Sequence, residues 1–261
     1  MKKTIFKSWW LYLLAAWVSI AVPLFAQETA FPGTEVVERL GERVPLEVRY
    51  VNDNGDSVQL GALLDKPTIL LLVYYNCPGI CVPLLNGMVT AIQGLDMQPG
   101  IDYKAISLSF NELETAELAR QKKANYLKQF PNGFPDEAWH WLTGDNRSIK
   151  KLTRSVGFNY IAAGKDFYHS AVAIVLSADG TITRYFHGVY FSPFDLKMAL
   201  MEAQSPAQRG WEAHLLNFTF RFDEGERRYM LNSARMALSG GGILLLGIVA
   251  GIARRRMRQN N

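Results

Sequence analysis

The two cysteines of the chain, Cys77 and Cys81, lie four positions apart in the segment YYNCPGIC, residues 74–81. Two thiols at this spacing can form a structural disulfide, act as a redox pair or bind a metal ion. A disulfide here would close a loop of only about five residues and stabilise the fold weakly, by roughly 2 kcal/mol. We therefore rank a purely structural disulfide last. A redox pair, with Cys77 attacking and Cys81 resolving, and a metal site are the stronger interpretations.

The residues around the cysteines predict a buried strand followed by a helix. Residues 67–76, PTILLLVYYN, form a largely continuous apolar run that is typical of a strand covered on both faces. Residues 82–95 have apolar side chains at helical spacing, with Pro83 in the first turn. Ligands collect at the carboxyl ends of such strands, and a helix N-terminus favours the thiolate form of a cysteine. The cysteines thus occupy a natural position for a site.

Strand and helix patterns alternate along residues 43–204 and predict an α/β fold. A hairpin is expected at residues 43–60, where two apolar-alternating runs flank the turn Asn-Asp-Asn-Gly-Asp. A strand–helix succession that ends in a hairpin and a helix predicts a three-layer domain with a mixed central sheet. The further strands are expected at residues 102–110, 139–144 and, as a pair, 169–191, and the further helices at 114–130, 146–158 and 193–204.

Residues 205–236 form an extension whose structure the sequence leaves open. One interpretation is another hairpin, with Asp-Glu-Gly at its turn, and the other is an ordered connection to the C-terminal end.

The excess of basic residues belongs to the two ends of the chain. The formal net charge is +4, but three lysines precede the first apolar run and four arginines follow the last one, so the middle of the chain is net acidic. This distribution indicates membrane topology rather than a phosphate-binding surface, and we expect no nucleic-acid partner. These basic residues are Lys2, Lys3, Lys7, Arg254, Arg255, Arg256 and Arg258.

Both ends are expected to contact a membrane. Residues 1–26 combine a basic start, an apolar run and a small residue at Ala26, which predicts a signal peptide or a signal anchor. Residues 237–253 are uncharged and predict a transmembrane helix, followed by a basic cytoplasmic tail at 254–261. Because basic flanks stay inside, the domain between them is expected on the periplasmic side of the cytoplasmic membrane, where thiols are exposed to oxidation.

With these features assembled, the chain resembles the Sco/SenC proteins. The resemblance is carried by YYNCPGIC and by HSAVAIVLSADG, residues 169–180, in which a His-Ser pair is expected to open a strand. It covers about residues 35–204. It implies a thioredoxin-like domain, placed here at residues 27–204, that is anchored in the membrane and helps to assemble the dinuclear copper centre of haem–copper oxidases. The copper ligands that it implies are Cys77, Cys81 and His169.

Ligand chemistry agrees with that implication. Two thiolates and an imidazole form a soft, mixed ligand set that suits copper in either oxidation state, whereas structural zinc normally has four protein ligands. His187 lies between aromatic residues on an expected strand, so packing explains it better than a role as fourth ligand. His140 is assigned to a structural position, and His214, which lies outside the domain, is assigned to an interface. The tyrosines Tyr74, Tyr75 and Tyr168 either shield the site from water or fill the core.

Three departures from the family pattern need an explanation. Val82 stands where a second proline often follows the cysteines, and residues 107–117 replace an Asp-Pro-x-Arg-Asp segment. The residue that often precedes the ligand histidine is an aspartate, but here it is Tyr168. The group that orients the imidazole is therefore absent, or it is Asp166 or a backbone carbonyl.

The resemblance implies delivery of copper to, or maintenance of thiols in, the copper-binding subunit of a cytochrome c oxidase. Other copper chaperones and thioredoxin-like reductants are further expected partners. On this interpretation the protein is a metallochaperone more than an enzyme. The alternatives are a thiol–disulfide oxidoreductase or peroxidase that uses Cys77 and Cys81, and a redox or copper sensor that signals through the membrane helix.

Overall fold

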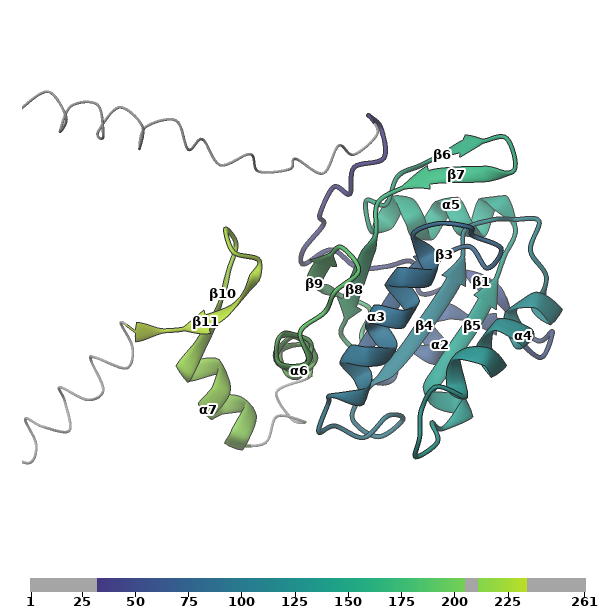
Figure 1. Ribbon diagram of the computed structural model, residues 1–261. Helices are drawn as coiled ribbons and strands as arrows, with labels where there is room; N and C mark the ends of the chain where they lie inside the picture. Colours follow the sequence, from purple (N-terminus) through teal and green to yellow (C-terminus); the bar gives the residue numbers. More distant parts are fainter. Residues whose placement is uncertain (1–31, 205–210, 234–261) are drawn as a thin grey trace, which may run out of the picture. The chain divides into compact units, whose positions relative to one another are not determined.

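The domain is built around a strand that is apolar on both faces. All six residues of β3 (Thr68–Val73), TILLLV, are buried, so the sheet needs cover on both sides. The computed structural model describes residues 32–204 and 211–233 (Figure 1). The predicted segments at residues 1–26, 237–253 and 254–261 lie outside these ranges. No helix within the two ranges has the length and apolar character needed to cross a membrane.

The central sheet is mixed and has seven strands in the order β2-β1-β5-β4-β3-β8-β9. Its middle is parallel, because β4 pairs with both β3 and β5 in the same direction. β8 pairs with β3, and β9 with β8, in the antiparallel sense. The predicted α/β fold with a mixed sheet is thereby confirmed. The strand bounds are β1 Arg49–Asn52, β2 Ser57–Gln59, β4 Lys104–Ser109, β5 Trp139–Thr143, β8 Val172–Leu176 and β9 Ile182–His187.

The N-terminal hairpin also forms as predicted. β1 and β2 pair in the antiparallel sense around the Asn-Asp-Asn-Gly-Asp turn, and β1 continues the sheet through β5. Within the turn, the side-chain oxygen of Asn52 accepts the backbone N–H groups of Asn54 and Asp56. This side-chain capping explains why the sequence turns at this point.

Helices connect the parallel strands, and α3 crosses the front face of the sheet while α2 lies behind it (Figure 1). Side chains of Thr115, Asp145 and Ser192 accept backbone N–H groups at the starts of α4, α5 and α6. These residue types are the preferred helix N-caps, so the starts are fixed locally. The bounds are α2 Leu60–Leu63, α3 Cys81–Gln93, α4 Ala116–Leu127, the short 3-10 helix η1 Asp136–Ala138, α5 Asn146–Ser155 and α6 Pro193–Ala203.

A two-stranded sheet that the sequence did not predict stands apart from the central sheet. β6 (Tyr160–Ala163) and β7 (Asp166–His169) pair with one another in the antiparallel sense. His169 therefore ends β7, and the next strand, β8, begins only at Val172. The expectation that the His-Ser pair opens the following strand was wrong, because a separate short hairpin precedes that strand.

The extension contains the hairpin that was one of its two interpretations. β10 (Phe220–Asp223) and β11 (Arg228–Leu231) pair in the antiparallel sense, preceded by an unpredicted helix, α7 (Trp211–Thr219). The hairpin contacts the domain through Tyr229, whose hydroxyl donates to Glu202 at 2.6 Å. Glu202 also binds Arg184 of β9 at 2.6 Å, and the guanidinium of Arg184 lies 4.4 Å from the centre of the Phe222 ring.

Candidate metal centre

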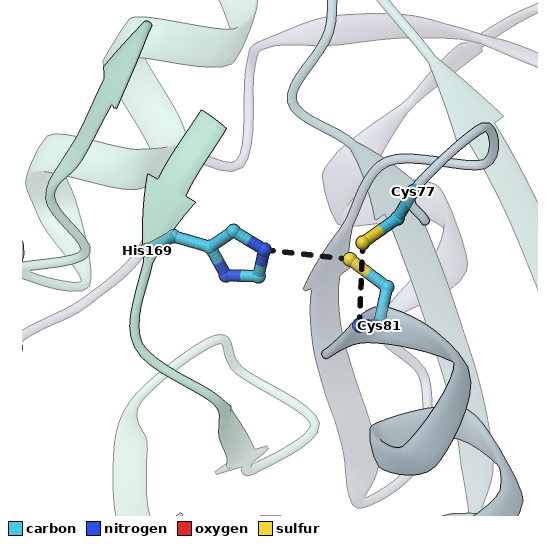
Figure 2. Close-up of side chains that lie close together, drawn as sticks. All are labelled: Cys77, Cys81 and His169. Carbon is cyan, nitrogen blue, oxygen red and sulfur yellow. Dashed lines mark hydrogen bonds between the residues drawn. The ribbon is translucent and has the colours of Figure 1, made fainter. Parts of the chain in front are cut away.

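Two cysteines and one histidine converge at the carboxyl end of β3. Cys77 lies in the loop after β3, Cys81 is the first residue of α3, and His169 is the last residue of β7. One ligand atom from each lies within 4.8 Å of the others, and no second such group occurs in the described ranges. Figure 2 shows the imidazole aimed at the sulfurs, with His169 Nε2 3.4 Å from Cys81 Sγ. The structure thus brings all three predicted ligands together.

The Cys77 sulfur lies at the N-terminus of α3. Its Sγ accepts the backbone N–H groups of Gly79 and Cys81, at 3.3 and 3.4 Å. The N-cap residue, Ile80, has no side-chain acceptor, so the sulfur takes the capping role at this helix start (Figure 2). These N–H groups and the helix dipole favour a thiolate at Cys77.

The two thiols have opposite proton affinities. The pKa of Cys77 is lowered, chiefly because the Cys81 thiol donates a hydrogen bond to it, with further contributions from His169 and the backbone N–H groups. The pKa of Cys81 is raised by burial and then by the neighbouring Cys77. Without a metal, Cys77 is therefore the thiolate of the pair, and Cys81 is the thiol that keeps its proton. A cation that binds both sulfurs displaces that proton.

A backbone carbonyl orients His169. Its Nδ1 lies 3.0 Å from the carbonyl oxygen of Ser170, to which the ring N–H donates, so Nε2 faces the sulfurs and is the nitrogen placed to bind a metal. Asp166 does not take this role, because it accepts a hydrogen bond from the Tyr74 hydroxyl at 3.4 Å. Of the two substitutes considered for the missing aspartate, the structure selects the carbonyl.

An aromatic cluster surrounds the imidazole. The rings of Phe110, Phe158 and Tyr74 have their centres 5.0, 5.8 and 6.0 Å from that of His169. Tyr74 is therefore the predicted tyrosine that shields the site. Tyr75 turns away and places its hydroxyl against the carbonyls of Ser107 and Leu142, and Tyr168 is 45% exposed.

The other histidines lie outside the cluster. His187 Nε2 is 2.7 Å from a carboxylate oxygen of Glu38, and its ring stacks on Tyr185. It is not a fourth ligand in this arrangement. His140 lies on β5, where burial lowers its pKa, and His214 is exposed on α7.

A buried acid that the sequence did not single out supports the cysteine loop. Glu114 accepts the backbone N–H groups of Tyr75 and Asn76, at 2.6 and 2.8 Å, and the hydroxyl of Ser109 at 2.6 Å. It lies within residues 107–117, the segment that replaces the Asp-Pro-x-Arg-Asp sequence of the family. No sequence signal separates it from Glu112 and Glu117, because glutamates before a helix usually face solvent.

The surface beside the sulfurs is open and apolar. Residues 78–80, which cover Cys77, are exposed, and so is Val82 in the first turn of α3. A groove begins there and runs between α3 and residues 189–192, where Gly87 allows the backbone of Val189 to approach closely. Val82 stands where the family often has a proline, and α3 still begins at Cys81.

A mixed α/β sheet, a cysteine pair at the start of the helix after its central strand and a histidine from a later strand together define a thioredoxin-like domain with a candidate metal site. The SCO1/SenC family model matches residues 39–201. The chain belongs to the SCO1/SenC family, and the resemblance drawn from its motifs is confirmed.

Solved structures share this fold. A protein from Aquifex aeolicus VF5 is 28% identical, with a TM-score of 0.57 over 63% of this chain and 94% of that one. BsSco, a member of the Sco family of cytochrome c oxidase assembly proteins with a disulfide switch, is 20% identical, with a TM-score of 0.52 over 65% and 97%. Arabidopsis thaliana ScoI, solved with copper bound, is 22% identical, with a TM-score of 0.50 over 63% and 98%. A search of curated proteins found no match.

Proposed function

We propose that this protein binds one copper ion through Cys77, Cys81 and His169 and acts in the assembly of the copper centre of a haem–copper oxidase. It either delivers the ion or keeps the thiols of the oxidase subunit reduced. The observation that carries the proposal is the convergence of two sulfurs and one imidazole nitrogen within 4.8 Å, in a chain of the SCO1/SenC family. Thiolate and imidazole ligands suit copper.

The accessibility of the site supports transfer rather than storage. Three protein ligands leave a coordination position to which a cysteine or histidine of a partner can bind before any ligand of this chain is released. The exposed residues 78–80 and Val82 let another protein approach the sulfurs. Stepwise ligand replacement then passes the ion without a free intermediate.

The relatives support a role in copper binding and oxidase assembly, and the two ends of the chain support a location at the membrane. Arabidopsis thaliana ScoI was solved with copper bound, and BsSco belongs to the cytochrome c oxidase assembly proteins. The basic flanks and apolar runs at residues 1–26 and 237–253 place the domain, in our proposal, on the periplasmic side of the cytoplasmic membrane. Labelling of an added surface cysteine in intact cells tests this location, and a label that enters only after lysis contradicts it.

A copper titration tests the ligand set. The full-length chain, reduced under anaerobic conditions, is titrated with Cu(I) and Cu(II) against a competing chelator, alongside His169→Ala and the control His187→Ala. We expect the His169 variant to lose at least about tenfold in copper affinity, since even groups that only orient a ligand are worth 10- to 100-fold. Unchanged affinity in that variant contradicts the three-ligand site. The His187 variant should match the wild type, because its histidine pairs with Glu38.

A transfer assay tests the role in assembly. Copper-loaded protein is mixed with the metal-free copper-binding subunit of an oxidase, and the metal content of each is measured after separation. We expect the subunit to gain copper at the expense of this chain. If the subunit gains none but its disulfide is reduced, the thiol-maintenance form of the proposal holds, and if neither occurs the assembly role fails.

The opposite pKa shifts of the two thiols favour a second candidate, thiol–disulfide exchange. The Cys77 thiolate attacks one sulfur of a partner disulfide, and Cys81 then loses its proton and displaces the partner from the mixed disulfide. The partner gains two electrons from this chain, one proton from Cys81 and one proton from water, and this chain ends with a Cys77–Cys81 disulfide. Turnover that needs both cysteines and ignores His169 supports this candidate over copper transfer.

A further inference from the structure

Glu114 is a buried carboxylate beneath the loop that leads to Cys77. Its side chain accepts three hydrogen bonds, from the N–H groups of Tyr75 and Asn76 and from the hydroxyl of Ser109. The residue is 8% exposed, and none of the ion pairs in the described residues includes it. All three partners are neutral donors, which matches an ionised carboxylate that acts only as an acceptor.

A carboxylate in such surroundings is unusual. Burial of a charge without an opposite charge costs free energy, which these hydrogen bonds offset only in part. The other buried acid of the described residues, Asp53, pairs with Lys123 at 3.1 Å. Stability of the fold therefore does not explain why a glutamate occupies position 114.

The two backbone donors directly precede a predicted copper ligand. Tyr75 and Asn76 lie immediately before Cys77, whose own N–H donates to the carbonyl of Tyr74 at 3.2 Å and closes the turn. The Tyr75 side chain is held separately by the carbonyls of Ser107 and Leu142. Without Glu114, two N–H groups of this turn would lose their acceptor, and the position of Cys77 would lose its support.

We infer that Glu114 is a positioning residue of the metal centre, which fixes the turn that carries Cys77 and places an uncompensated negative charge against the backbone of that turn. This inference rests on the proposed copper function. The negative charge stabilises the more positive ion, so it favours Cu(II) over Cu(I). Geometry and charge are two separable effects of one side chain.

Glu114→Gln and Glu114→Asp separate these effects in the full-length chain. Glutamine keeps the size of the side chain but removes its charge. Its NH₂ group cannot accept a hydrogen bond, so one of the backbone N–H groups loses its acceptor. We expect Cu(II) affinity to fall about tenfold more than Cu(I) affinity, which raises the potential of the bound copper by about 59 mV for a one-electron couple. Aspartate keeps the charge but has a shorter reach, so both affinities should fall alike and the potential should stay near that of the wild type.

Hydrogen exchange in the copper-free chain supplies a second readout. NMR should show the amides of Tyr75 and Asn76 exchanging about tenfold faster in both variants, since each variant loses native acceptor geometry. The matched control is Glu202→Gln, which removes the same charge from a carboxylate that binds Arg184 and Tyr229. It should lower the melting temperature without changing the copper potential or the exchange at residues 75 and 76.

The outcomes separate this inference from the proposed function. An unchanged potential and unchanged exchange in Glu114→Gln overturn the inference while copper binding by the wild type stands. A potential that rises equally in the glutamine and aspartate variants overturns the charge effect. If the wild type binds no copper, the proposed function and the charge effect both fail, and the exchange measurement alone decides whether Glu114 positions the turn. If the glutamine variant does not fold, the aspartate variant carries the exchange test.

Discussion

The predicted ligands come from two regions that are held in different ways. The cysteine turn, residues 74–81, is continuous with the central sheet and with α3, and its cysteines are 9% and 1% exposed. The histidine hairpin, β6 and β7, forms a sheet of its own, and none of its strand residues is fully buried. Elements with few buried contacts open locally at lower free energy than the core does.

This difference indicates that the cysteine turn and the histidine hairpin have different roles in holding and releasing the ion. The sulfurs form a fixed pair, because the N–H groups of the turn donate to Glu114 and the N–H group at the start of α3 donates to the Cys77 sulfur. His169 depends on the aromatic cluster and on a hairpin that forms no strand pairs with the central sheet. A site that must release its ion benefits from one ligand on an element of lower stability. We expect His169 to leave the ion before the cysteines do.

The largest effect is expected from the fixed pair. Cys77→Ser and Cys81→Ser each remove a thiolate, and each should lower copper affinity by more than about 100-fold, the upper end of what groups that only orient ligands contribute. Competition titrations against a chelator measure it. If His169→Ala weakens binding more than either serine variant, the two regions have the opposite roles from those proposed here.

The aromatic support of the histidine can be removed separately. Phe110 is buried against Tyr74, Phe158 and His169, so Phe110→Ala should lower the free energy of unfolding by about 3–5 kcal/mol. It should also weaken copper binding, because the imidazole loses its packing. Chemical denaturation and the copper titration measure the two effects.

A matched control for this change is Phe130→Ala. Phe130 is also buried and packs on Phe134 and Trp139, away from the three ligands. It should destabilise the domain while copper affinity stays at the wild-type level. Equal losses of affinity in the two variants would mean that general loosening of the core, rather than support of His169, weakens binding.

The pH dependence of alkylation tests the electrostatic link between the regions. Because the pKa of Cys77 is lowered, its thiolate persists below neutral pH, and iodoacetamide should modify it at pH 6 nearly as fast as at pH 8. An ordinary thiol, with a pKa near 8.5, loses roughly tenfold in rate per pH unit in this range. His169→Ala removes one of the groups that lower this pKa, so its profile should move to higher pH. Identical profiles would show that the imidazole does not act on Cys77.

The smallest effect is expected from the C-terminal hairpin. Tyr229→Phe removes the hydrogen bond to Glu202 and should lower the free energy of unfolding by about 1 kcal/mol. Copper affinity should stay unchanged, because this hydrogen bond joins β11 to α6. A change in affinity would add this hairpin to the regions that control the site.

The sequence was informative where one physical pattern dominated. The run TILLLV predicted a strand covered on both faces, and the cysteines after it predicted a site at the start of a helix. The histidine hairpin escaped prediction because β6 and β7 are four residues each and mix exposed and half-buried positions. Such short strands lack a clear alternation of apolar and polar residues.

Glu114 escaped for a different reason. Its importance depends on the backbone N–H groups of Tyr75 and Asn76, which are distant in sequence and are brought to it by the parallel pairing of β3 and β4. Backbone donors leave no mark in the residue types. A carboxylate that binds backbone N–H groups therefore cannot be recognised from a sequence motif. A carboxylate that binds an arginine or a lysine can, because the sequence shows the basic partner.

The hydrogen bonds at the start of α3 have a consequence for recognition. The Cys77 sulfur accepts the N–H groups of Gly79 and Cys81, so a metal ion or a disulfide that uses its lone pairs competes with them. The exposed side chains of Ile80 and Val82 belong to the same turn. We therefore expect the surface of this turn to differ between the copper-loaded, copper-free and oxidised protein, which gives a partner a basis for telling them apart.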